Sequence, residues 1–225
     1  MRLLGYILLV LIVWRLLAFV PILGGSFIGL WVAVLLTSAI VGRVGERLVV
    51  ARRDAAQVRA LEAVDSPHNH GKLGSLLLGR GRARAALPHL ERAREGEPDS
   101  LEWQYRLALA YEGVGRREEA RGVLNGLLAV DAEYAYGAAQ LRAAALAQDA
   151  GEHARVLELL DTYDKNHGES PESAFRRGKA LRASGQKEPA ARSFERVGQL
   201  AREAARYQRG EAQAWALRAF FAKFV

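Results

Sequence analysis

The chain has no cysteine among its 225 residues. Disulfide bonds and thiolate metal sites are therefore excluded, although this absence does not indicate a compartment. The remaining metal-ligand types do not form a set either. His68 and His70 stand two residues apart, so on a helix they point to different sides, and Asp65 is the only acidic residue near them. We interpret these histidines as polar residues at the start of a helix. We expect neither a bound metal nor a cofactor.

The sequence also contains no motif that is typical of a catalytic site. No glycine-rich phosphate loop follows a strand, because the run Gly79 to Gly81 has the pattern of a turn between two helices. There is no nucleophile elbow, and no pair of carboxylates or histidine–aspartate set stands at a spacing that indicates chemistry. We therefore expect a protein that is not an enzyme.

Charge is nearly missing from residues 3–41, where Arg15 is the one charged residue. As one helix this stretch would be about 58 Å long, against about 30 Å of membrane hydrocarbon. Pro21, Gly24 and Gly25 interrupt its middle, which favours a break between two helices. We predict a transmembrane hairpin over residues 1–42, with helices at about 3–20 and 26–42.

Two other interpretations of this stretch are weaker. A cleavable signal peptide needs a short apolar core, whereas here the apolar run continues. A single span over 16–41 would leave the apolar residues 3–14 in water. Arg15 itself has two interpretations: it extends to the outer interface beside Trp14, or it pairs with another membrane protein.

Basic residues flank the predicted hairpin and indicate its orientation. Five arginines lie within residues 43–59, and Arg2 precedes the first span, so the positive-inside rule places both ends in the cytoplasm. Residues 43–66 are predicted to form a basic juxtamembrane helix with one apolar stripe. Two interpretations stay open: the arginines of 43–59 contact anionic lipid, or the helix extends the second span and packs on the domain that follows.

Four glycines recur at intervals of 34, 36 and 34 residues: Gly81, Gly115, Gly151 and Gly185. A small or medium apolar residue follows each glycine after five positions: Ala86, Ala120, Val156 and Ala190. A large apolar residue comes four positions later: Leu90, Leu124, Leu160 and Phe194. This period and spacing are typical of a helix–turn–helix solenoid. Solenoids expose extended binding surfaces, so the pattern favours recognition of a partner.

Residues 67–204 resemble the tetratricopeptide repeat family, in a membrane-anchored bacterial form. The resemblance implies an all-α solenoid of four repeats, at 67–100, 101–134, 135–170 and 171–204, the third of which carries two extra residues near its start. Ser66 and Ser170, each followed by proline, are predicted to cap the first and last repeats.

Residues 205–225 are predicted to form a capping helix. Leu217, Phe220, Phe221 and Phe224 recur at helical spacing, and Trp215 lies nearby. We expect this aromatic face to cover the last repeat, because solenoids need such an end piece. The alternative is that the same face binds a partner.

The resemblance also implies that the first helix of each repeat lines a concave groove. Its sixth position is basic in all four repeats, and neighbouring groove positions add two cations and two aromatic residues; the eight candidates are Lys72, Tyr105, Arg106, Arg142, Phe175, Arg176, Lys179 and Arg182. Such a row suits an acidic peptide. The alternative is that an arginine-rich chain places arginine on any solvated face.

The net charge of +7 alone would also suit nucleic acid. No aromatic stacking motif accompanies it, so we do not expect nucleic-acid binding. The Ala/Arg-rich composition suggests a bacterial source. We expect a membrane-anchored scaffold or adaptor that binds protein partners at the cytoplasmic face of a bacterial inner membrane. The alternative is a regulatory subunit of a membrane enzyme or protease complex in envelope biogenesis or quality control, contacted mainly through Arg15 and the hairpin.

Overall fold

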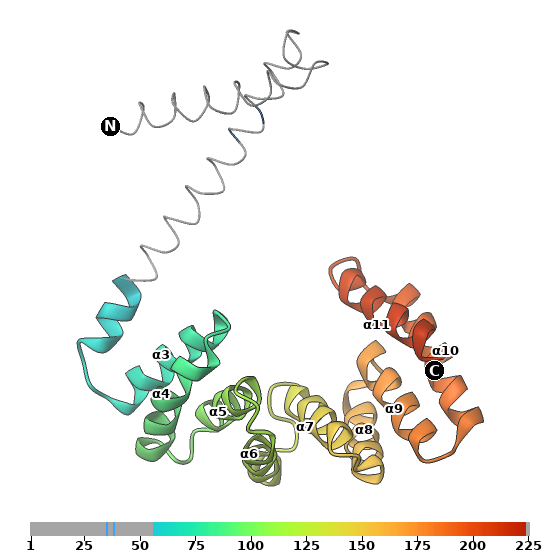
Figure 1. Ribbon diagram of the computed structural model, residues 1–225, viewed down its shortest axis with the longest axis horizontal. Helices are drawn as coiled ribbons and strands as arrows, with labels where there is room; N and C mark the ends of the chain where they lie inside the picture. Colours follow the sequence, from blue (N-terminus) through green and yellow to red (C-terminus); the bar gives the residue numbers. More distant parts are fainter. Residues whose placement is uncertain (1–34, 36–37, 39–55, 224–225) are drawn as a thin grey trace. The chain divides into compact units, whose positions relative to one another are not determined.

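The computed structural model describes residues 35, 38 and 56–223 of the chain (Figure 1). The chain divides into two units, residues 1–63 and 64–225. In the first unit residues 35, 38 and 56–62 are helical. The predicted hairpin with Arg15, and most of the predicted juxtamembrane helix, lie outside the described residues. Within the described part, no helix combines the length and apolarity that a membrane crossing requires.

The second unit consists of helices and turns, with no strand among its described residues. The helices follow one another along an arc (Figure 1). Their bounds are α3 Pro67–Gly79, α4 Ala83–Gly96, α5 Leu101–Gly113, α6 Arg117–Val130, α7 Ala138–Asp149, α8 His153–His167, α9 Pro171–Ala183, α10 Lys187–Glu203 and α11 Arg209–Ala222. Each stretch predicted as one repeat contains two of these helices, and α11 follows the last.

The turn inside each helix pair is made by one of the four recurring glycines. Gly81, Gly115, Gly151 and Gly185 have φ of 71°, 84°, 76° and 80°. A side chain is strained in this left-handed region, whereas glycine adopts it freely. The spacing of the glycines therefore predicted the turns correctly.

Serine caps close the starts of the first and last repeats, as predicted. The Ser66 hydroxyl accepts the Asn69 amide at 3.2 Å. At α9, the Ser170 hydroxyl accepts the Ser173 amide and the Ser173 hydroxyl accepts the Ser170 amide, each at 3.0 Å. This reciprocal pair satisfies amides that the helix itself leaves without partners. Pro67 and Pro171 occupy the first turns, where no amide is needed.

The core is built from the periodic apolar positions. The four large residues predicted for the second helices are at most 3% exposed, and the four smaller ones at most 1%. Close crossing of the two helices within one repeat depends on glycine at two places in the first helices. A Cβ on Gly74 would lie 2.5 Å from Leu90, and a Cβ on Gly178 would lie 2.7 Å from Phe194. Interiors packed to this density tolerate an added methyl group poorly.

The junction before the third repeat is irregular, as its two extra residues suggested. Ala135, Tyr136 and Gly137 all have positive φ, of 54°, 54° and 77°. The chain makes a left-handed turn there, and α7 begins only at Ala138. A Cβ on Gly137 would lie 2.6 Å from the Tyr163 ring, so the turn also packs closely on α8. Tyr136 is 91% exposed.

The last helix caps the solenoid through a different face from the one predicted. Helix α11 buries Ala212 and Ala219 and packs Trp215 against the final repeat, where the Trp215 ring lies 5.4 Å from Phe175. Leu217, Phe220 and Phe221 are 58%, 56% and 60% exposed, and Phe224 lies outside the described residues. The prediction that this aromatic face covers the repeat was wrong. Alanines let α11 approach closely, and a single tryptophan fills the remaining space.

Candidate partner-binding surface

The predicted row of cations lies on the first helices of the repeats, but most of its charge is already paired. Arg106 lies 3.9 Å from Glu102, Arg142 lies 3.3 Å from Glu112, and Arg176 lies 2.6 Å from Glu172. Lys72 is exposed and has no acidic partner among the described residues. Two of the three pairs have the i,i+4 spacing that stabilises a helix, with glutamate on the N-terminal side. An acidic ligand would therefore have to compete with the chain's own carboxylates.

Arg182 and Phe175 belong to the fold of the solenoid's end. The Arg182 guanidinium donates to the backbone carbonyl of Ala222, at the C-terminal end of α11, and lies 5.3 Å from the centre of the Phe194 ring. Phe175 packs between the Phe194 and Trp215 rings, at 6.0 and 5.4 Å. These contacts attach the cap to the last repeat, so neither side chain is free to hold a peptide.

Tyr105 and Lys179 complete the predicted set. The Tyr105 ring lies 5.5 Å from Tyr134. Burial, and next the Glu102 carboxylate, raise the pKa of Tyr134, so its hydroxyl is neutral at physiological pH. Lys179 is exposed, without an acidic partner among the described residues. Of the eight predicted groove residues, Lys72 and Lys179 are thus the cations left to a ligand, and they stand at opposite ends of the row.

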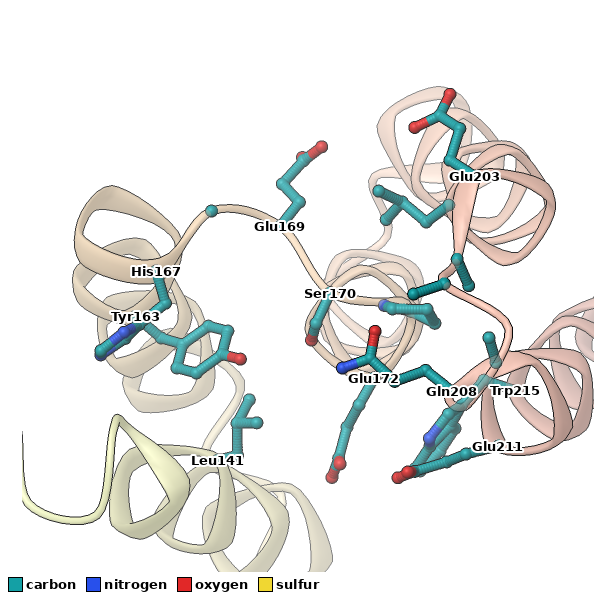
Figure 2. A pocket seen from close by; sticks show the side chains of 16 residues that line it. Leu141, Tyr163, His167, Glu169, Ser170, Glu172, Glu203, Gln208, Glu211 and Trp215 are labelled. Atoms are coloured by element: carbon teal, nitrogen blue, oxygen red, sulfur yellow. The ribbon is translucent and has the colours of Figure 1, made fainter.

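A pocket of about 500 Å³ lies where the third repeat, the fourth repeat and the cap meet. Figure 2 shows Leu141, Tyr163 and His167 on one side and Trp215 with Glu211 on the other. Between these walls run the loop before α9 and the turn before α11. The pocket therefore exists only when the repeats and the cap are stacked together.

Four glutamates line this pocket, and none of the described lining residues is lysine or arginine. Glu169 pairs with Arg196 at 2.7 Å, and Glu172 pairs with Arg176 at 2.6 Å. Two further glutamates are less neutralised. Glu203 lies 3.9 Å from Arg196, which it shares with the closer Glu169, and Glu211 has no basic partner among the described residues. The pocket is therefore an acidic site on a chain whose net charge is +7.

The N-terminus of α9 forms part of the pocket but does not offer an anion site. The Ser173 amide already donates to the Ser170 hydroxyl, and the Ala174 amide donates to the Ser170 carbonyl at 3.0 Å. Glu172 supplies a negative charge in the first helical turn. Groups of the chain itself thus offset the positive end of the helix dipole.

A second polar cluster, which the sequence interpretation missed, lies in the first repeat. The Nδ1 atoms of His70 and His89 are 2.9 Å apart, and the Asp65 carboxylate lies 2.7 Å from His70 Nε2. The two histidines come from α3 and α4, nineteen residues apart, so spacing along one helix could not reveal the contact. No group of three or more metal-ligand side chains is arranged around a common point in the described part of the chain.

Comparisons with known proteins agree with the observed helical fold. The sequence profile of the tetratricopeptide repeat family matches residues 77–145. A crystal structure of MamA protein is similar, with 18% identity, a TM-score of 0.60, and coverage of 70% of this chain and 87% of that chain. MamA from Desulfovibrio magneticus RS-1 (residues 41 to the end) is similar too, at 18% identity, a TM-score of 0.58, and coverage of 72% and 94%.

A MamA structure designated AMB-1 gives 17% identity and a TM-score of 0.61 over 70% of this chain and 87% of that one. At these identities the likeness establishes the fold alone. A comparison with curated protein sequences gave no match. The profile shows that residues 77–145 contain tetratricopeptide repeats, and the described helices have the fold of a tetratricopeptide repeat solenoid.

Proposed function

We propose that this tetratricopeptide repeat protein is a membrane-tethered scaffold whose solenoid binds a protein partner, and that its role is recognition, not catalysis. The observation that carries the proposal is the pocket between the third repeat, the fourth repeat and the cap. Pockets formed between stacked repeats are suited to holding side chains of an extended segment. The tetratricopeptide fold supports a protein as the partner.

The tether belongs to the same proposal and rests on the sequence. Residues 3–41 carry only the charge of Arg15, and a hairpin over 1–42 would satisfy every backbone group inside the membrane. The arginines of 43–59 would place the solenoid on the cytoplasmic side of a bacterial inner membrane and contact anionic lipid. A reporter that is active only in the cytoplasm, fused after residue 225, tests this placement. An inactive reporter on a membrane-inserted fusion would reject it.

Partner capture tests the scaffold role directly. Full-length chain, affinity-purified from cross-linked native membranes, is expected to retain one or a few specific proteins identified by mass spectrometry. A matched chain lacking residues 1–42 is expected to capture the same proteins from a detergent extract, because the solenoid carries the contact. Loss of every specific protein from both samples would contradict the proposal.

A second candidate follows from Arg15, the lone charge of the apolar stretch. An arginine inside a membrane helix is a pairing site for an acidic residue of another membrane protein. In that case the chain is a regulatory subunit of a membrane enzyme or protease complex, and its hairpin makes the main contact. Deletion of residues 1–42 would then abolish capture, which separates the two candidates.

A further inference from the structure

We propose that the pocket between the third repeat, the fourth repeat and the cap receives an arginine or lysine side chain, so that the solenoid recognises a basic segment of its partner. The inference rests on the proposed scaffold function and specifies the chemistry of the partner. It reverses the expectation of an acidic peptide, which came from the row of cations on the first helices.

Charge is the first argument. The whole chain has a net charge of +7, so a basic peptide is repelled on average. In contrast to this net positive charge, the pocket is lined by four glutamates: Glu169, Glu172, Glu203 and Glu211. The histidine of the lining, His167, is turned to Glu133, with His167 Nε2 2.9 Å from the carboxylate. A basic side chain is thus attracted to the pocket.

The shape of the pocket is the second argument. Leu141 and Tyr163 face Trp215 across the opening (Figure 2). Lysine and arginine carry three- or four-carbon stems that pack on such apolar walls while the charged group stays near carboxylates and water. In Figure 2 the Glu211 side chain reaches toward the space between the walls. The pocket thus combines walls for the stem with a carboxylate, that of Glu211, which has no basic partner in the part of the chain that the structure describes.

Competing ligands fit less well. An anion would meet Glu203 and Glu211, the two less neutralised carboxylates, and the helix N-terminus beside it is closed by the Ser170 cap. An isolated aromatic side chain would leave Glu211 without a partner. The guanidinium groups of Arg218 and Arg176 already lie 4.4 and 5.6 Å from the centre of the Trp215 ring, so a further cation does not need the ring face. The carboxylates, with the walls as support, are the recognition element.

The test uses the full-length chain in lipid nanodiscs without anionic lipid and a fluorescent twelve-residue peptide of alternating alanine and arginine. Fluorescence anisotropy is expected to show saturable binding that weakens as salt increases, because exposed charges are screened. The matched peptide of alternating alanine and glutamate is not expected to bind.

The double variant Glu203→Gln and Glu211→Gln is expected to weaken binding of the basic peptide by about tenfold, at up to about fivefold per exposed ion pair removed. Glu95→Gln with Glu188→Gln is the matched control, because both residues are exposed and lie outside this pocket. The control pair is expected to bind as the parent chain does. Glu211→Lys is expected to remove binding altogether.

Three results would overturn the inference: equal weakening in both double variants, tighter binding of the acidic peptide, or no binding of the basic peptide. None of these would affect the scaffold proposal if native partners are still captured from membranes. Conversely, failure to capture any partner while the basic peptide still binds at the pocket would contradict the scaffold role and leave the chemistry of the pocket established.

Discussion

Individual residues decide where this chain turns and how closely its helices cross. The turn glycines have positive φ with open space around them, so their role is conformational. Gly74 and Gly178 have the opposite role, because a side chain there would meet Leu90 or Phe194. Sequence spacing could identify both groups, because turn and crossing positions recur once per repeat.

Replacing a turn glycine is expected to destabilise the solenoid through the backbone alone. Gly115 has φ of 84°, and no atom lies within 4 Å of the place that an alanine methyl group would take. We expect Gly115→Ala to lower the free energy of unfolding by about 1 kcal/mol. Gly122→Ala is the matched control: Gly122 lies inside α6 with equally open space, so alanine should raise stability by about 0.5–1 kcal/mol. Urea denaturation measures both, and the same sign of change would contradict this account.

A crossing glycine should respond through packing. We expect Gly178→Ala to lower the free energy of unfolding by about 1–3 kcal/mol, because the new methyl group would lie 2.7 Å from the Phe194 ring. Adding Phe194→Leu should recover part of the loss by making room. If the double variant loses more free energy of unfolding than the two single variants lose together, the steric explanation fails.

At the scale of helices, the cap shows where prediction from the pattern went wrong. Helix α11 has apolar residues on two faces: alanines with Trp215 on one, and Leu217, Phe220 and Phe221 on the other. Hydrophobicity alone favoured the phenylalanines. The alanines form the buried face instead, because their small side chains let α11 lie close to α9 and α10. The ion pairs of Arg106 and Arg176 were open to prediction, since Glu102 and Glu172 stand four residues before them.

The two faces of α11 should differ in their effect on stability. Leu217→Ser with Phe221→Ser is expected to change the free energy of unfolding by no more than about 0.5 kcal/mol per site, because both side chains are mainly exposed. Trp215→Ala should lower it by about 2 kcal/mol or more, since the ring packs against the last repeat. Thermal unfolding compares them. A larger loss from the serine pair would restore the predicted aromatic capping face.

For the whole molecule, the order of helices was predictable because each repeat is a local unit with its own turn glycine and apolar periodicity. The pocket was not predictable in this way. Its walls come from Leu141, Tyr163 and Trp215, which are brought together only by the stacking of repeats and the return of α11 onto the last one. Its glutamates are scattered along the sequence, where each one resembles an ordinary solvated residue. Stacking turns them into one acidic site.

Site-specific photo-crosslinking in cells tests most directly whether this pocket holds the partner. A photo-reactive amino acid placed at Gln208, in the pocket, is compared with one at Ala129, which is exposed on α6 away from it. We predict a discrete crosslinked protein from position 208 that is absent from position 129 and reduced by Glu203→Gln with Glu211→Gln. The same crosslinks from both positions, or a crosslinked protein from position 129 only, would contradict partner binding at the pocket.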